Sequence, residues 1–346
     1  MMIDTLKSLC ALHGVSGNEG EVRDYIADYA AKHADKASTD AMGNVIVLKK
    51  GAKTPSKKIV LCAHMDEVGV IITGVADDGY LKFAMAGGLD SRVVVGKSVT
   101  IGKGRVFGII GCKPIHLVKS KDREKALETE ELYIDIGAKN SEEAKKLVSL
   151  GDTGAFDDTI RDFGDGFVMA KAIDDRFGCA ALLELIRSDL PVDCHFVFSV
   201  QEEVGLRGAY PAAYNMAADI AMIIEATTAA DFPSVKESKK ICKTGKGAVI
   251  PFMDGGTIYD RELFTLITGL ADKNGIPWQT KNVISGGTDG AAFQRSRMGV
   301  KTVGLAAPVR NLHSPLCVAK YSDMEAVYEL ARVFLEEMGS AKNEPF

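Results

Sequence analysis

Acidic and histidine side chains lie beside apolar stretches at several places in this chain. His64 and Asp66 follow one such stretch, and Glu202 and Glu203 follow another. A histidine two residues from an aspartate points to the same side of an extended segment, so His64 could bind a metal while Asp66 orients its ring. Adjacent glutamates at a strand end can divide two tasks, one binding a metal and the other handling a proton.

Three other places add more groups of the same kinds. Asp174 and Asp175 open a predicted helix, Glu225 ends an apolar run, and His313 lies in a later polar segment. Each place alone also fits a structural role, such as a hydrogen-bonded core histidine, a helix cap with a salt bridge, or a solvated acid pair. Together they form a mixed nitrogen and oxygen set that suits zinc, cobalt or manganese better than calcium.

Hydrophobic patterns indicate an α/β protein that holds these residues at the carboxyl ends of strands, where open α/β sheets collect functional groups. The chain length favours two structural units, and short glycine-punctuated β-type runs between residues 70 and 163 indicate a small inserted β-rich domain. We therefore predict a main domain of residues 1–68 and 165–346, and an insert of residues 69–164. Within the main domain we expect helices at 4–33, 180–186 and 262–272 and strands at 45–48, 59–63, 196–200, 220–224 and 300–305.

Two local patterns carry more specific expectations. The run 93–101 is expected to be a strand of the insert, and Ser322 to Glu325 form a capping box that predicts the start of a last helix. The Gly286 to Gly290 segment fits either an ordinary turn or a loop through which the backbone approaches a substrate.

Bulk properties exclude several classes of protein. The net charge of −5, without a run rich in Lys and Arg, argues against nucleic acid as a partner. No segment approaches the ~20 apolar residues of a membrane helix. The 7 cysteines are scattered without a Cys-x-x-Cys pair, which is typical of reduced thiols. We expect a cytoplasmic protein with no membrane partner.

The chain resembles the M42 metallo-aminopeptidases, a co-catalytic family that includes glutamyl and leucyl aminopeptidases and the tetrahedral TET peptidases. The resemblance covers nearly the whole chain, with its motifs in family order: Gly14-Val15-Ser16-Gly17, Gly43-Asn44, His64-Met65-Asp66-Glu67, Gly87-Gly88, Asp174-Asp175-Arg176, Gln201-Glu202-Glu203-Val204-Gly205, Gly286-Gly287-Thr288-Asp289 and His313-Ser314-Pro315. It implies a zinc-peptidase-like mixed sheet flanked by helices, with the insert as a barrel-like dimerisation domain.

The resemblance also implies a role for each site residue. Asp174 would bridge two divalent metal ions per subunit, Zn²⁺ or Co²⁺ foremost and Mn²⁺ as an alternative. One ion would be held by His64 and Glu225, and the other by Glu203 and His313. Glu202 would be the general base and Asp66 the partner of His64. Position 225 departs from the family, which commonly has aspartate there.

The function implied is hydrolysis of the N-terminal peptide bond of peptides with a free amino terminus. A homo-oligomer is also implied, from a dimer to a tetrahedral dodecamer. Two alternatives stay open: a related metal-dependent carboxypeptidase or deacylase, and a metal-stabilised assembly protein without catalysis. Retention of Glu202 argues against the second, because a structural metal site needs no base.

Overall fold

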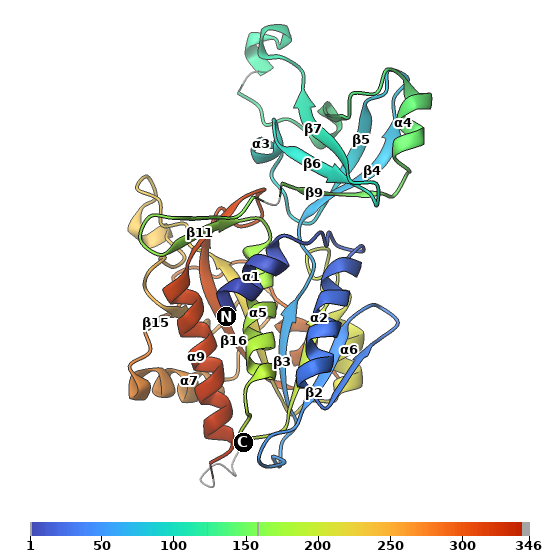
Figure 1. The fold of residues 1–346 in the computed structure, drawn as a ribbon. Helices are drawn as coiled ribbons and strands as arrows, with labels where there is room; N and C mark the ends of the chain where they lie inside the picture. The colour runs from blue at the N-terminus through green and yellow to red at the C-terminus, as the bar shows by residue number, and fades with distance from the viewer. Residues whose placement is uncertain (1, 123, 158, 341–346) are drawn as a thin grey trace.

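The computed structural model describes residues 2–122, 124–157 and 159–340. A large α/β unit carries a smaller closed β-barrel at one end, at the top of Figure 1. The expected α/β fold, with a mixed sheet flanked by helices and a β-rich barrel, is confirmed. In the described part of the chain, no helix is long and apolar enough to cross a membrane.

Among the described residues the large sheet has 11 strands, and its order along the hydrogen-bonded path is β1-β2-β12-β3-β13-β16-β17-β11-β10. The four strands β12, β3, β13 and β16 run parallel to one another in the centre, and antiparallel strands flank them. The strands are β1 (Lys36–Thr39), β2 (Val45–Lys49), β3 (Ile59–His64), β10 (Arg161–Phe163), β11 (Phe167–Ala170), β12 (Cys194–Ser199), β13 (Ile220–Thr228), β14 (Ala248–Val249), β15 (Trp278–Gln279), β16 (Lys301–Arg310) and β17 (Cys317–Lys320).

Helices cover both faces of this sheet, and the alternation of side chains along β3 shows why. Ile59 and Leu61 pack into a core cluster with residues of α1, α2, α5, α7 and α9, whereas Val60 and Cys62 pack into a second cluster with residues of α6 and α8. A strand buried on both faces reads as a continuous apolar run, which is what the sequence shows. The helices are α1 (Met2–Cys10), α2 (Gly20–His33), α5 (Ile173–Arg187), α6 (Ala209–Met216), α7 (Arg261–Asn274), α8 (Gly290–Gln294) and α9 (Tyr321–Met338), with a 3₁₀ turn η4 (Glu237–Lys239).

The barrel closes in the order β4-β5-β8-β7-β6-β9 around its own core, which includes Val70, Ile72, Val99 and Ile134. The chain enters it directly from β3 and leaves it after β9, and β10 then pairs with β11 of the large sheet. Its elements are β4 (Gly69–Val75), β5 (Leu81–Ala86), α3 (Ser91–Val94), β6 (Ser98–Ile101), β7 (Val106–Cys112), η1 (Ile115–Leu117), η2 (Ser120–Asp122), η3 (Thr129–Glu131), β8 (Leu132–Asp135), α4 (Ser141–Leu147) and β9 (Thr153–Phe156).

Two local expectations were wrong. The run 93–101 is not one strand: the Asp90 side chain caps a short helix, α3, by accepting from the Arg92 amide, and β6 begins only at Ser98. The capping box at Ser322 is absent, because α9 already begins at Tyr321. The Asp323 carboxylate instead accepts from the backbone amides of the distant Gly245 and Gly247.

Candidate metal centre

The predicted site residues come together at the carboxyl ends of the central parallel strands. His64 is the last residue of β3, and Glu202 and Glu203 follow the end of the neighbouring β12. Glu225 lies in the second half of β13, and His313 follows β16. Because these four strands run parallel, their carboxyl ends share one edge of the sheet, and the side chains converge above it.

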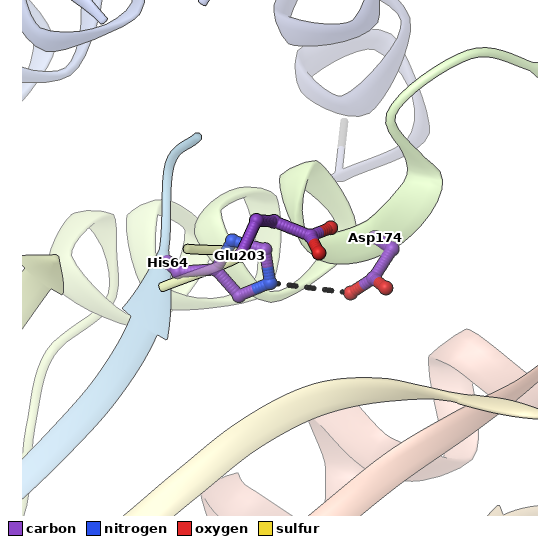
Figure 2. A group of neighbouring side chains, drawn as sticks. All are labelled: His64, Asp174 and Glu203. Atoms are coloured by element: carbon purple, nitrogen blue, oxygen red, sulfur yellow. Dashed lines mark hydrogen bonds and ion pairs between the residues drawn. The ribbon is translucent and has the colours of Figure 1, made fainter. Parts of the chain in front are cut away.

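Asp174 enters the same space from the start of α5. Its backbone is not helical, with φ −81° and ψ 111°, so the regular helix begins after it and its carboxylate is directed toward the strand ends. Its Oδ1 lies 3.2 Å from His64 Nε2, and its Oδ2 lies 3.5 Å from His313 Nε2. Figure 2 shows His64, Asp174 and Glu203 close together, and they come from three separate segments of the chain. One carboxylate therefore faces both imidazoles.

Two glutamates extend this pattern. Glu225 Oε1 lies 3.4 Å from His64 Nε2, and Glu203 Oε2 lies 3.2 Å from His313 Nε2. Two atoms bound tetrahedrally to one ion at ~2.0–2.1 Å are about 3.3–3.4 Å apart. The nitrogen and oxygen atoms thus have the separations of ligands that share an ion, and His64, Asp174 and Glu203 form a group able to hold a metal.

Asp66 ties His64 to the turn that carries the two glutamates. Its carboxylate is fully buried, and Oδ1 lies 3.3 Å from His64 Nδ1. The same oxygen accepts a hydrogen bond from the Glu202 amide at 3.0 Å. Oδ2 accepts from Ser16 Oγ at 2.6 Å and from the Glu203 amide at 3.2 Å. Burial raises the pKa of Asp66, but the hydrogen bonds from His64 and these donors outweigh burial and leave it below its ordinary value. One anion thus orients the ring of His64 and positions the Glu202-Glu203 backbone.

The site holds more buried acid than its own cations balance. Burial raises the pKa of Glu203 and of Glu225 to about 8, and the pKa of Glu202 lies well above its usual range for the same reason. The hydrogen bond to Asp174 raises the pKa of His313 to about 9. Burial lowers the pKa of His64, but neighbouring acids, Glu225 foremost, outweigh burial and hold it well above the ordinary value. Ionising all these acids together requires further positive charge.

Asp175 is a site group that the family pattern did not assign. It is fully buried, and burial raises its pKa well above the usual value. Its Oδ1 accepts from the Gly178 amide, but its Oδ2 has no hydrogen-bond partner among the described residues. A ligand atom of Asp175 lies within 4.8 Å of those of His64 and Glu225. An orphaned carboxylate oxygen beside two potential ligands agrees with a cation site, so the residues fit the divalent metals that the sequence predicts.

The walls of the site include features that the sequence left open. The Gly286 to Thr288 segment lines the same cavity of about 430 Å³ as His64 and Glu202, so it is not only a turn. A Cβ atom on Gly88 would lie 3.1 Å from His313 Nδ1, so a larger residue there would press on the imidazole. Lys281 also lines the cavity. No pattern in the sequence predicts a place for this lysine in the site, because only the tertiary structure buries it.

Comparison with known proteins agrees with this geometry. The family model described as M42 glutamyl aminopeptidase matches residues 43–330. The lysyl aminopeptidase of Pyrococcus furiosus is 31% identical, over 97% of this chain and 97% of that protein. These two names differ in the preferred residue, so the family does not fix it.

Solved structures give the same result. An aminopeptidase from the archaeon Desulfurococcus kamchatkensis is 34% identical with a TM-score of 0.92, covering 99% of this chain and 98% of that chain. The TET1 peptidase of Pyrococcus horikoshii, which can assemble into a tetrahedron or a large octahedral shell, is 35% identical with a TM-score of 0.84, covering 97% and 99%. With the family match over most of its length and such relatives over nearly all of it, this chain belongs to the M42 aminopeptidases and is a peptide hydrolase.

Proposed function

We propose that the protein is a two-metal aminopeptidase that hydrolyses the N-terminal bond of peptides. The observation that carries this proposal is the position of Asp174, whose two oxygens face His64 and His313. In that position one carboxylate would bridge two cations. Glu225 would complete the site at His64, and Glu203 would complete the site at His313.

Divalent cations held by these residues, zinc or cobalt first and manganese as the alternative, would polarise the scissile carbonyl and lower the pKa of the attacking water. Glu202 lines the same cavity and is the general base of this proposal. It takes a proton from water as the water oxygen bonds to the carbonyl carbon. It then gives that proton to the amine nitrogen as the carbon–nitrogen bond breaks. Burial raises the pKa of Glu202 above its ordinary value, so its carboxylate is a stronger base than that of an exposed glutamate.

Asp66 has no contact with the peptide in this mechanism. It keeps the ring of His64 in place and accepts from the amides of Glu202 and Glu203. The general base Glu202 and the metal ligand Glu203 therefore keep fixed positions relative to His64. The free α-amino group of the peptide would lie near an acid of the site, and this contact would limit cleavage to the first residue.

Assembly into a homo-oligomer, from a dimer to a tetrahedral dodecamer, is part of this proposal. Support comes from the shell formed by the Pyrococcus horikoshii relative and from apolar side chains exposed on β7 of the barrel, Phe107 and Ile109, 60% and 47% exposed. We propose the barrel, within an insert of residues 69–164, as the dimer contact, and the cytoplasm as the location. Light scattering coupled to size exclusion would report the mass, and Phe107→Ser should lower it.

The test of the activity uses metal-stripped protein and a panel of aminoacyl anilides, with zinc, cobalt or manganese added back. We expect metal to restore cleavage, and Glu202→Gln to abolish it while still binding metal. Glu262→Gln, an exposed change on α7, is the matched control. N-acetylated versions of the same substrates should resist cleavage. Cleavage of blocked substrates alone would favour the carboxypeptidase or deacylase alternative, and no cleavage with any metal would favour a protein without catalysis.

A further inference from the structure

The loop that carries the proposed general base, Glu202, has an unusual backbone. It runs from Val200, which follows β12, to Gly208, which precedes α6, and within it Gln201 and Leu206 have φ of +56° and +58°. Such left-handed angles are uncommon for residues other than glycine, and they cost free energy unless the surroundings hold them. Because Gln201 directly precedes Glu202, whatever holds Gln201 in this conformation also sets the direction of the base.

One asparagine joins the two ends of this loop. Asn44 is fully buried, accepts a hydrogen bond from the Val200 amide at 3.0 Å and donates one to the Gly208 carbonyl oxygen at 2.9 Å. Its Nδ2 also donates to Asp40 Oδ2 at 2.7 Å. A Cβ atom on Gly208 would lie 2.3 Å from the side-chain oxygen of Asn44, so this contact requires glycine. The ends of the loop are thus fixed, and its remaining freedom lies between them.

Two carboxylates hold the middle of the loop through three successive backbone amides. Asp66 accepts from the amides of Glu202 and Glu203. The amide before them, that of Gln201, donates to Glu19 Oε1 at 3.2 Å. Burial raises the pKa of Glu19, and the nearby Asp66 raises it further. Two buried acids that approach each other are costly because their charges repel, so this arrangement is not what the stability of the loop alone would favour.

The side chain of Glu19 serves this loop and not its own helix. Glu19 precedes α2, at the position from which a side chain ordinarily caps a helix, but it makes no such hydrogen bond. It is 7% exposed, and its Oε1 also accepts from the Gly17 amide at 2.7 Å. The segment ahead of it is tied to the residues after β3, because the Ser16 amide donates to the Glu67 carbonyl oxygen and the Ser16 hydroxyl donates to Asp66. Glu19 is therefore fixed relative to the metal centre.

We propose that Glu19 is a positioning residue for the general base Glu202 and acts through the Gln201 amide. The inference rests on the proposed aminopeptidase function and adds a residue on which that reaction depends. Glu19 lines a different cavity, of about 520 Å³, from the one that His64 and Glu202 line, so it acts on the reaction through the loop. Without it, Gln201 can leave its left-handed conformation and turn the base away from the attacking water. A hydrogen bond to a charged group contributes enough to change such a population by about 10- to 100-fold.

The experiment compares three substitutions at position 19. Glu19→Gln keeps a carbonyl oxygen that can accept from both amides, whereas Glu19→Met has nearly the same length and no acceptor. Glu19→Asp keeps the charge but withdraws the carboxylate by about 1.5 Å. Because aspartate is a favoured cap residue for α2, this third variant should fold even if Glu19→Met does not.

Glu21→Met is the matched control. Glu21 lines the same cavity as Glu19, and its ion pair with Arg105 is exposed, so its loss should change little. For each protein we would measure kcat and KM on the best anilide of the panel, zinc affinity by chelator competition, and the free energy of unfolding in urea. Hydrogen exchange of the peptide that spans Val200 to Leu206, followed by mass spectrometry on metal-stripped protein, adds a readout that does not depend on turnover.

We expect Glu19→Met and Glu19→Asp to lower kcat by at least about tenfold, with KM and zinc affinity close to those of the natural protein, because Glu202 acts in the transition state and not in binding. Glu19→Gln should restore kcat, and Glu19→Asp should lose it without a lower free energy of unfolding. An unchanged kcat in Glu19→Met and Glu19→Asp would overturn the inference. So would an equal loss in Glu19→Gln, or a loss that follows zinc affinity or unfolding, because either would mark a structural residue.

If the natural protein cuts no anilide, the proposed activity fails, and the exchange of the loop amides decides on Glu19 alone. Faster exchange in Glu19→Met and Glu19→Asp, but not in Glu19→Gln or Glu21→Met, would support the anchoring of Gln201. Equal exchange in all of these proteins would overturn it.

Discussion

Asp66→Asn is the change that best tests how the centre is held. Four donors converge on this fully buried carboxylate: the Nδ1 of His64, the Oγ of Ser16, and the amides of Glu202 and Glu203. Asparagine keeps the shape but replaces one oxygen by an NH₂ group, so two donors lose their acceptor whichever way the amide faces. At about 1.5–3 kcal/mol for each hydrogen bond to a charged group, the loss is about 3–6 kcal/mol.

This loss should divide between metal binding and folding. A group that orients a metal-binding histidine typically accounts for a factor of about 10–100 in metal affinity, or about 1.4–2.8 kcal/mol. The remainder should appear as a lower free energy of unfolding of the metal-free protein, since the turn that carries Glu202 and Glu203 loses its anchor. Competition with a chromophoric zinc chelator measures the first quantity, and urea unfolding followed by circular dichroism measures the second.

Ser16→Ala is the matched control for this experiment. It removes one donor from Asp66 but leaves the carboxylate and its contact with His64, so it should destabilise by only about 0.5–1.5 kcal/mol. Its zinc affinity should stay close to that of the natural protein. The reasoning would be refuted if Asp66→Asn bound zinc as tightly as the natural protein, or if Ser16→Ala weakened zinc binding as much as Asp66→Asn does.

Three further changes test other parts of the centre. Metal affinity should rise by at least about tenfold per pH unit between pH 6 and 8. The reason is that the pKa values of His313 and Glu225 are raised to about 9 and 8, so a metal ion must displace protons from them. Calorimetry in buffers of different ionisation enthalpy counts these protons, and an affinity independent of pH would contradict the prediction. Glu225→Asp shortens the side chain and withdraws its carboxylate by about 1.5 Å, well beyond the ~0.2 Å tolerance of a metal bond. Zinc binding, measured by chelator titration, should therefore weaken by roughly tenfold or more. Unchanged binding would show that Glu225 is not a ligand. Lys171→Met removes the ammonium that lies 2.8 Å from the buried Glu67 carboxylate, so it should lower the free energy of unfolding, measured in urea, by about 3 kcal/mol. Adding Glu67→Gln should restore part of that free energy. A change below about 1 kcal/mol would mean that the remaining donors to Glu67 suffice.

Much of the fold follows from local patterns. The run that ends at His64 is apolar without alternation because helices cover both faces of the sheet, and this pattern depends only on the burial of each residue. The placement of Glu202 and Glu203 after a strand is local in the same sense. Once the central strands are taken as parallel, their carboxyl ends must meet, and the convergence of acids and histidines follows.

The features that the sequence did not predict depend on distant partners. The segment from Ser322 to Glu325 has the sequence of a capping box, but Asp323 accepts from the amides of Gly245 and Gly247, which lie far from it in the chain. The helix starts two residues earlier than the local pattern indicates. The role of Asp66 in holding the Glu202 and Glu203 amides could not be predicted either, because these contacts join segments more than a hundred residues apart. No local propensity carries such information.

The buried acids of the site share one electrostatic problem, a shortage of positive charge. Glu203 and Glu225 are buried with too few cations nearby, and the orphaned oxygen of Asp175 shows the same shortage. Divalent metal would relieve it, and the relief explains how acids can follow apolar strands in a stable protein.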